Sequence, residues 1–537
     1  MNESSRCSRS TAENGHFQEA PEPSSPSPMR PMPASGSAHA QPTTPPLPPL
    51  LFDPTRHRHD RRVEQWIPRA LAVRLKVFPF TCAADNSLLA LLAEHPADLG
   101  LREQLRRRLP AGTEIRLHAA TAVEIEQAID RHYGYSEEID RLLAQLDAEQ
   151  QLSFRPARSE RPAIRPLLDA LIADAVRLEA SDLHFEPEAG FARIRYRIDG
   201  WLRVIRLLPG SIWQPLQICL KLLAGLDIAD SRSAQDGRFT QHIAGREVDF
   251  RVASLPTLHG ENLVLRIHDR QRSLLSLQQL GLDAASEQLL ERIRQRPEGI
   301  LIITSPTGSG KTTTLYSLLD MVSHPGVNTM TLEDPVEHPL PLIRQTQVCD
   351  AVRLDFANGI RSLLRQDPDI IMVGEIRDTA SAEMAFRAAL TGHQVYTTLH
   401  ANSALAALPR LLDLGVSPAT LAGSLNGIVG QRLLRRLCPH CRQLRPANEV
   451  PDPAAAWLAC GCPDCDWQGY RGRLAVMEIL RLTPPLADLI AAGAPPEQLR
   501  RAAVAGGYRP LAEAARQLAT AGLTTLTEAA RVIDLEP

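Results

Sequence analysis

The chain has 537 residues, 44% of them hydrophobic, and a formal net charge of −3 at pH 7. A chain of this length is too long to fold around a single hydrophobic core, so we expect three or more domains. The near-neutral charge argues against a general electrostatic attraction to nucleic acid. The sequence has no apolar run of about 18 residues and begins without an apolar stretch, so we expect neither a membrane span nor a secretory signal.

Residues 1–56 are rich in Pro, Ser, Ala and Gln, so we predict a disordered tail with polyproline character. Residues 57–135 are predicted to form a small α/β domain, and polar, charged residues over 136–160 a linker. Within the small domain the pattern indicates a short strand over 71–77, a strand or helix over 88–92 and an amphipathic helix over 122–133.

Residues 161–270 combine a helical pattern with alternating strand patterns. Apolar residues recur at helical spacing from Leu167 to Val176, and Asp199-Gly200 suits a two-residue hairpin turn. The alternating segments are 192–198, 201–204, 248–253 and 262–267. We therefore expect a helix packed on an antiparallel sheet. Several arginines lie on its strands, and from the pattern alone we interpret them as part of a solvated face.

A buried strand pattern over 300–304 leads into Ser305-Pro306-Thr307-Gly308-Ser309-Gly310-Lys311-Thr312-Thr313 and then a helical pattern. This order predicts the strand, phosphate loop and helix of an ATP site formed by these nine residues. Gly308 and Gly310 let backbone N–H groups approach phosphates, and the helix N-terminus adds partial positive charge. Lys311 would bridge the β- and γ-phosphates and the Thr312 hydroxyl would bind Mg²⁺. Ser305 replaces the first glycine of the pattern, so its backbone must not be left-handed.

Three further strand patterns in this region end in polar residues. The strand over 327–332 is followed by Glu333, the strand that begins at Asp369 leads to Glu375, and the strand over 394–399 is followed by His400. Strands alternating with helices predict a parallel sheet with ligands at the carboxyl ends of its strands. Each residue alone could be a satisfied polar group, but together they favour a shared nucleotide site.

Cys438, Cys441, Cys462 and Cys465 form two C-x₂-C pairs about twenty residues apart, the spacing of a zinc ribbon. The paired spacing favours these four residues as ligands over Cys460 and His440. It also favours a metal site over two disulfides, as expected in a reducing, cytoplasmic compartment. A basic patch of Arg432, Arg435, Arg436, Arg442 and Arg445 could contact a partner protein or lipid headgroups; a solvated face is an equal alternative.

Four motifs in this order resemble those of the type II secretion and type IV pilus assembly ATPases. They are residues 305–312, Leu-Glu-Asp-Pro-Val-Glu at 332–337, the segment 364–378 that ends Val-Gly-Glu-Ile-Arg-Asp, and Leu-Thr-Gly-His…Thr-Leu-His at 390–400. The resemblance implies a RecA-like P-loop ATPase domain over 271–537 with a zinc-binding insert at about 436–468 and C-terminal helices. It also implies a PAS-like α+β domain before it and a small N-terminal α/β domain.

The resemblance also implies the roles of individual residues. Lys311 and Thr312 would bind phosphate and Mg²⁺, Glu333 would activate water, and Glu375 would act mainly through Mg²⁺, although these two carboxylates are not firmly separated. His393 and His400 match the histidine box, and Arg238, Arg251 and Arg266 match positions that offer arginines to the γ-phosphate. Ala401 and Ala514-Ala515 depart from the usual pattern without removing a catalytic group.

The expected protein is a cytoplasmic homo-hexamer that hydrolyses ATP for type II secretion. Its expected partners are an inner-membrane platform protein and a membrane anchor with a cytoplasmic domain, so it would lie peripherally at the inner membrane. The alternative in the same class is a type IV pilus extension ATPase. A nucleic-acid translocase is disfavoured by the charge and the 4% aromatic content, and a non-catalytic scaffold is disfavoured by intact Lys311, Glu333 and Glu375.

Overall fold

The computed structural model describes residues 61–83, 85–151, 163–269, 275–349, 354–446, 448, 450 and 452–535. The predicted disordered tail over 1–56 lies outside these residues, as does the second part of the predicted linker. Within the described residues, no helix combines the length and the hydrophobicity that crossing a lipid bilayer requires.

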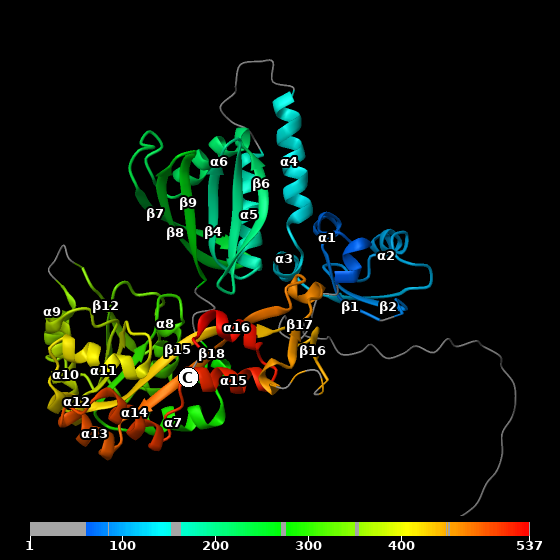
Figure 1. The fold of residues 1–537 in the computed structure, drawn as a ribbon. Coiled ribbons are helices and arrows are strands. Elements are labelled where there is room, and N and C mark those ends of the chain that lie inside the picture. The colour runs from blue at the N-terminus through cyan, green and yellow to red at the C-terminus, as the bar shows by residue number, and fades with distance from the viewer. Residues whose placement is uncertain are drawn as a thin grey trace, which may run out of the picture. The chain divides into compact units, whose positions relative to one another are not determined.

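The first region is a three-stranded sheet with surrounding helices (Figure 1). Its elements are η1 Arg61–Gln65, α1 Arg69–Leu75, β1 Val77–Cys82, β2 Leu88–Ala93, α2 Leu99–Arg106, β3 Glu114–Ala119 and α3 Ala122–His132. The central strand β2 pairs antiparallel with β1 and parallel with β3. The predicted helix over 122–133 is confirmed, and a capping box between Thr121 and Glu124 fixes its start.

The predicted strand over 71–77 is wrong. Residues Arg69–Leu75 form helix α1, which ends at Lys76 in the left-handed conformation, and the strand begins only at Val77. Apolar residues at 71, 73, 75 and 77 alternate as in a strand, but Val73 is 45% exposed whereas its neighbour Ala72 is buried. Burial therefore follows a helical face and not the alternation.

The first part of the predicted polar linker is a helix. Residues Ser136–Gln151 form α4, and Ile139, Leu142 and Leu146 are buried in the same core as helix α5, Ile164–Arg177. These three residues follow one another at intervals of three and four, so they form one apolar stripe among charged neighbours.

The middle region is a six-stranded antiparallel sheet with two helices, which confirms the predicted combination of helix and antiparallel sheet. Its strands are β4 Ala180–Glu188, β5 Phe191–Ile198, β6 Trp201–Pro209, β7 Gln235–Ile243, β8 Arg246–Thr257 and β9 Gly260–Asp269, in the order β6-β5-β4-β9-β8-β7. Alternate strand residues join α5 and α6, Gly210–Leu223, in one core, which leaves the other sheet face polar. Asp199 and Gly200, both with positive φ, form the predicted turn between β5 and β6.

The motor region contains a seven-stranded sheet in the order β12-β11-β13-β14-β10-β15-β18. Its strands are β10 Gly299–Thr304, β11 Thr329–Glu333, β12 Ile343–Gln347, β13 Ile370–Val373, β14 Gln394–Leu399, β15 Leu425–Leu437 and β18 Tyr470–Arg481. All neighbouring strands are parallel except the antiparallel pair β15 and β18.

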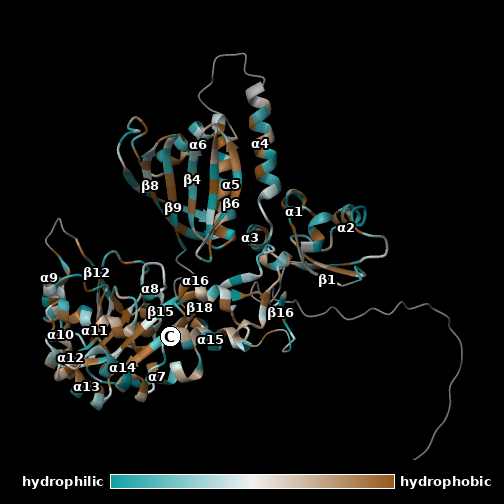
Figure 2. Cartoon of the chain, in the orientation of Figure 1, coloured by the Kyte–Doolittle hydropathy of each residue, from teal (hydrophilic) through white to brown (hydrophobic). Residues whose placement is uncertain are grey.

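Helices cover both faces of this sheet. They are α7 Ala284–Arg294, α8 Lys311–Val322, α9 Phe356–Leu363, α10 Thr379–Leu390, α11 Ala404–Asp413, α12 Pro418–Ser424, α13 Pro484–Ala491, α14 Pro496–Ala505, α15 Leu511–Thr520 and α16 Leu526–Val532, with η3 Leu277–Leu280. Ile300 and Ile302 join the core of α9–α12, whereas Leu301 and Ile303 join that of α7 and α8. Figure 2 shows this hydrophobic interior in brown. Burial on both faces explains the continuous apolar strand pattern.

A small insert lies between β15 and β18. It consists of β16 Arg442–Leu444, η5 Pro453–Ala455, β17 Trp457–Ala459 and η6 Pro463–Cys465, with β16 and β17 paired antiparallel. The fold class predicted from the sequence is confirmed: an α/β motor with an insert, preceded by an α+β region and a small α/β region.

Candidate nucleotide and metal sites

The phosphate loop connects β10 to α8 at the carboxyl end of the central strands. Gly308 and Gly310 have φ of 76° and 85°, so the left-handed positions fall on the two glycines, while Ser305 is not left-handed. Ser305 can therefore occupy the position of the first glycine of the pattern, because its backbone is not left-handed. The Lys311 Nζ donates to the carbonyl oxygens of Ser305, at 2.9 Å, and Pro306, at 3.1 Å.

Side chains from the loop and from β15 fix its shape. The hydroxyls of Ser305 and Ser309 contact each other, and Ser309 donates to the Pro306 carbonyl at 2.7 Å. The amide of Gln431 donates to the Ser309 carbonyl and accepts from the Thr314 hydroxyl, both at 2.8 Å. Gln431 was not singled out in the sequence, because only the pairing of β10 with β15 brings a residue more than 100 positions away to the loop.

The loop also has the charge that a polyphosphate requires. Burial and the nearby guanidinium of Arg432 lower the pKa of Lys311, and burial likewise lowers the pKa of Arg432. Lys311 makes no ion pair with a carboxylate in the residues that the structure describes. Two cations beside left-handed glycines and a helix N-terminus fit the phosphates of ATP with Mg²⁺ at Thr312.

Glu333 ends β11 and is almost completely buried, with 3% of its surface exposed. It accepts hydrogen bonds from the hydroxyl of Thr331 at 2.6 Å, from the amide of Gln345 at 3.0 Å and from the hydroxyl of Tyr316. Tyr316 and Gln345 were not singled out in the sequence, since they come from α8 and β12, and only the folded sheet brings them to Glu333.

Glu375 lies two residues beyond β13 and contacts two other side chains of the site. Its carboxylate is 3.4 Å from His400 Nε2 and pairs with Arg377, which also donates to Asp334 at 3.3 Å. Because β11, β13, β14 and β10 are neighbours, Glu333, Glu375, His400 and the phosphate loop lie at one edge of the sheet, as predicted. Burial and the charges of Lys311 and Arg377 lower the pKa of His400.

His393 lies away from the phosphate loop, so the structure does not bring it together with Glu333, Glu375 and His400. It precedes β14 whereas His400 follows it, so the two residues are separated by the strand, about 20 Å at 3.3 Å per residue. The Nδ1 of His393 lies 3.0 Å from the Ala388 carbonyl oxygen, and its own carbonyl accepts from Gly299 at the start of β10.

The three predicted arginines lie side by side on the polar face of the middle sheet. Arg238, Arg251 and Arg266 occupy paired positions on β7, β8 and β9, and all three are exposed. Arg251 donates to Glu337 at 3.2 Å and Arg266 to Asp182 at 3.1 Å. This row is evident only from the strand register, and it groups the three guanidinium groups as one basic surface.

The four predicted cysteine ligands converge on one point. Their sulfur atoms all lie within 4.8 Å of one another, at 3.8 Å for Cys438 and Cys462 and 3.7 Å for Cys441 and Cys465. Sulfur atoms bound to zinc at about 2.3 Å would be about 3.8 Å apart at the corners of a tetrahedron. A disulfide requires about 2.05 Å. The cluster does not include Cys460 or His440.

Three backbone N–H groups around the cluster contact its sulfur atoms. Burial raises the pKa of Cys438 and of Cys441, whereas backbone N–H groups of Cys462 and Gly469 outweigh burial and lower the pKa of Cys465. A bound metal would hold all four groups as thiolates, and the N–H donors of Gly461, Cys462 and Gly469, each at 3.2 Å from a sulfur, would stabilise them.

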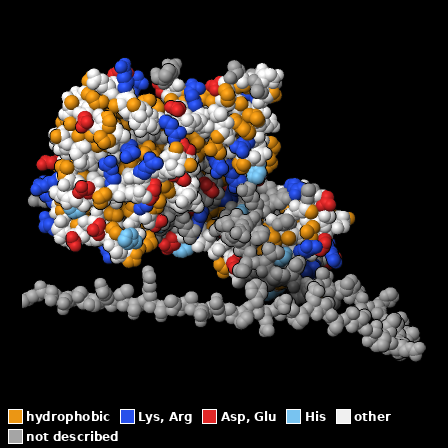
Figure 3. Space-filling view, turned by 90° about the horizontal axis from the view of Figure 1, so that it is seen from below, with side chains coloured by type: hydrophobic (Ala, Val, Ile, Leu, Met, Phe, Trp, Pro, Cys, Tyr) orange, Lys and Arg blue, Asp and Glu red, His pale blue; other side chains and the backbone are white. Residues whose placement is uncertain are grey.

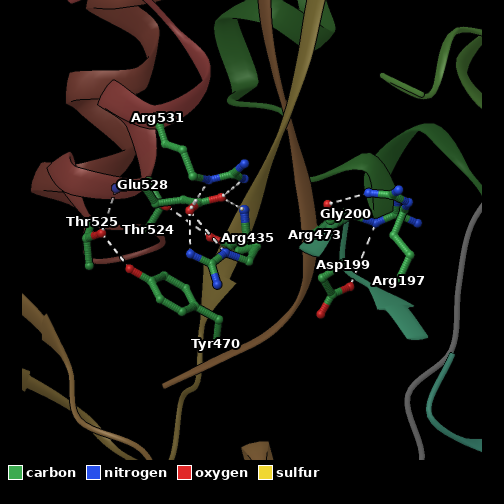
Figure 4. A network of polar contacts seen from close by, with 10 residues as sticks. All are labelled: Arg197, Asp199, Gly200, Arg435, Tyr470, Arg473, Thr524, Thr525, Glu528 and Arg531. Carbon is green, nitrogen blue, oxygen red and sulfur yellow. Dashed lines mark hydrogen bonds and ion pairs between the residues drawn. The ribbon is translucent and has the colours of Figure 1, made fainter. Parts of the chain in front are cut away.

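The predicted basic patch near the cysteines is not a uniformly exposed group, because four of its five arginines are half-buried and contact other groups. Arg432 donates to the Asn402 carbonyl, Arg435 pairs with Glu528, Arg442 donates to the Gly522 carbonyl and Arg445 to the Ala455 carbonyl, which leaves Arg436 exposed. Figure 4 shows Glu528 held between Arg435 and Arg531. On the face shown in Figure 3, basic and acidic side chains are interspersed and not gathered by sign.

The sheet order, the phosphate loop and the acidic strand ends together define the motor region as a RecA-like P-loop ATPase. The X-ray structure of the Legionella pneumophila ATPase DotB has the same fold, with a TM-score of 0.52 and 21% identity over 71% of this chain and 97% of DotB. The chain belongs to the Type II/IV secretion system protein family, whose model matches residues 157–531. An MshEN domain model matches residues 47–139.

Several curated proteins are similar over most of the chain. Type II secretion system protein HxcR of Pseudomonas aeruginosa is 42% identical, covering 74% of this chain and 82% of HxcR. Type II secretion system protein E of Pectobacterium carotovorum is 38% identical over 85% of this chain and 97% of its own length. The type IV pilus assembly ATPase PilB of Myxococcus xanthus is 36% identical over 86% and 85%. The chain is therefore an ATP hydrolase of the secretion and pilus-assembly class.

Proposed function

We propose that this ATPase drives pseudopilus assembly and protein export by a type II secretion system. The observation that carries the proposal is the similarity to type II secretion system protein E, which extends over 85% of this chain and 97% of that relative. The enzyme would work as a cytoplasmic homo-hexamer at the inner membrane, bound to a platform protein and to a membrane anchor with a cytoplasmic domain.

In the proposed reaction, Lys311 moves from the loop carbonyls to the β- and γ-phosphates of ATP. Thr312 would hold Mg²⁺ through its hydroxyl and Glu375 would act on the ion, which would supply charge neutralisation for the phosphates. Glu333 orients the attacking water. His400, neutral because its pKa is low, contacts Glu375 and would report the nucleotide state to the neighbouring subunit.

The arginine row completes the proposed site. Arg238, Arg251 and Arg266 stand on one exposed surface, so one movement of the middle region would carry all three toward a γ-phosphate. Cationic stabilisation of a transferred phosphoryl group is worth about 10³ or more in rate in other enzymes. Zinc at the four cysteines would have a structural role, because four protein ligands leave no open position for chemistry.

The alternative is a type IV pilus extension ATPase, and the similarity to PilB over 86% of this chain favours it. Deletion of the gene separates the two. Loss of exoprotein secretion with surface pili intact supports type II secretion, and loss of pili with normal secretion supports the alternative. Complementation with the wild-type gene should restore the phenotype, and complementation with Lys311→Ala should not.

A further inference from the structure

The carboxylate of Glu333 is enclosed by donors from three different elements. Tyr316 on α8 donates to Oε2, while Thr331 on β11 and Gln345 on β12 donate to Oε1. A buried carboxylate needs such partners, because water no longer solvates it. These contacts also determine where the two oxygens of Glu333 can lie.

Tyr316 is the contact that joins Glu333 to the phosphate-loop helix. It lies one helical turn after Thr312, is 1% exposed, and its hydroxyl also accepts a hydrogen bond from the backbone N–H of Glu337 at 3.3 Å. Burial and the neighbouring Glu333 raise the pKa of Tyr316 well above its usual range, so the hydroxyl keeps its proton as a donor. One phenol thus ties two positions of the 333–337 segment to α8.

Gln345 is itself held in the orientation that this arrangement needs. Its side-chain oxygen accepts from the N–H of Leu340 at 2.7 Å, and its side-chain nitrogen donates to the His338 carbonyl at 2.9 Å as well as to Glu333. The amide group therefore presents its nitrogen, and not its oxygen, to the carboxylate.

We propose that Tyr316 is a positioning residue for ATP hydrolysis, which fixes the carboxylate of Glu333 relative to Lys311 and Thr312. The inference rests on the proposed role of Glu333. Since α8 is a continuous helix that begins at Lys311, the position of the phosphate loop sets the position of the Tyr316 hydroxyl. The hydroxyl in turn sets the position of Glu333, and Gln345 supports it from the opposite side.

The test compares Tyr316→Phe with Tyr396→Phe in the full-length protein. Tyr396 is also 1% exposed and belongs to the same core, and its hydroxyl has no hydrogen-bond partner among the described residues. Tyr316→Phe should lower kcat by about tenfold to a hundredfold, the range for a small misplacement of a catalytic group. The KM for ATP should match that of Tyr396→Phe, whose kcat should equal that of the wild type. The Tm of Tyr316→Phe should lie below that of Tyr396→Phe, because the buried carboxylate of Glu333 loses a donor. A wild-type kcat for Tyr316→Phe, or an equal loss in both variants, would overturn the proposal.

A double variant tests whether Tyr316 acts through Glu333. Single-turnover hydrolysis is measured for Glu333→Gln and for Glu333→Gln combined with Tyr316→Phe. If Tyr316 works through the carboxylate, the second substitution should lower the residual rate by less than about twofold. A full, independent loss would contradict the proposal. If Glu333→Gln alone keeps the wild-type rate, the assigned role of Glu333 fails instead, which separates the two conclusions.

Discussion

The motor region has two sites that differ in which groups satisfy their polar atoms. One is the cysteine cluster, and the other is the nucleotide edge, formed by the carboxyl ends of β10, β11, β13 and β14. At the nucleotide edge the protein supplies a partner for each main polar group: Lys311 donates to loop carbonyls, Glu333 accepts from three donors, and Glu375 pairs with Arg377. In the cluster, four sulfur atoms face one point at the spacing of a metal tetrahedron. The polar groups of the first site are therefore satisfied by the fold itself, whereas the second has the geometry of a site that an ion would complete.

Removing the metal should produce the largest effect and should be confined to the insert. Structural zinc contributes about 10 kcal/mol or more in isolated zinc-finger peptides, so Cys465→Ser or a strong chelator should unfold residues around 438–470. Hydrogen exchange should show fast exchange there and unchanged protection in β10 and α8. Cys460→Ser is the matched control, because Cys460 is exposed and outside the cluster. Equal loss of protection at the phosphate loop would contradict the contrast between the two sites.

Glu375→Gln should abolish most of the catalytic activity without destabilising the fold around the nucleotide site. Losing the carboxylate that we propose acts on Mg²⁺ should lower kcat by about 100-fold or more, while ATP affinity and Tm change little. Steady-state kinetics and thermal unfolding check both expectations. Asp320→Asn, an exposed carboxylate on α8, serves as the control. A fall in Tm that matches the loss of activity would mean that Glu375 is mainly structural.

Glu528 provides a third kind of polar site, a buried carboxylate satisfied by arginines alone. Its side chain is 0% exposed and pairs with Arg435 and Arg531, so Glu528→Ala should cost about 3 kcal/mol of unfolding free energy, measured by urea titration. Glu497→Ala, which removes an exposed ion-pairing carboxylate, should have no measurable effect. Equal effects would show that burial is not what makes Glu528 important.

The same carboxylate gives a pH dependence. Burial opposes ionisation, but Arg531 and Arg435 outweigh it and hold the pKa of Glu528 below its usual range. A lowered folded-state pKa means that the stabilisation is complete above the unfolded value, about 4.3, and is lost as the pH falls below it. The Tm of the wild type should therefore fall more steeply below about pH 4 than that of Glu528→Gln. Parallel curves would contradict this sign.

The two histidines give the smallest expected effect. His400→Gln should lower kcat by about tenfold, the typical scale for one positioned polar contact at an active site, whereas His393→Gln should change it by less than about twofold. The reason is their placement at opposite ends of β14. Equal losses in the two variants would return His393 to the site, most directly through a neighbouring subunit.

The sequence predicted those parts of the site in which chemistry and neighbours in the chain coincide. The phosphate loop, the strand-ending carboxylates, the Asp199-Gly200 turn and the cysteine spacing are all short-range patterns, and the structure places them as expected. What it missed depends on distant partners. Gln431 reaches the phosphate loop through strand pairing, and Tyr316 reaches Glu333 through the packing of α8 on the sheet.

The errors have equally physical reasons. Alternation over 71–77 concealed a short helix, and a high charge density over 136–151 concealed the apolar stripe of Ile139, Leu142 and Leu146. The arginines around the cysteines looked like a surface patch because the sequence does not show which carbonyls and carboxylates they reach. Arg435, for example, is neutralised by a residue more than 90 positions away.

The most direct test of the account is ATP hydrolysis by the purified wild-type chain and by Lys311→Ala, both supplied with zinc and Mg²⁺. Among the described residues, the hydrogen bonds of the Lys311 ammonium group go to loop carbonyls alone, so its replacement should leave the Tm unchanged. The wild type should hydrolyse ATP, and Lys311→Ala should lose about 10³-fold or more of that rate because the γ-phosphate loses its cation. Equal rates in the two proteins would contradict the claim that ATP is bound and cleaved at this loop.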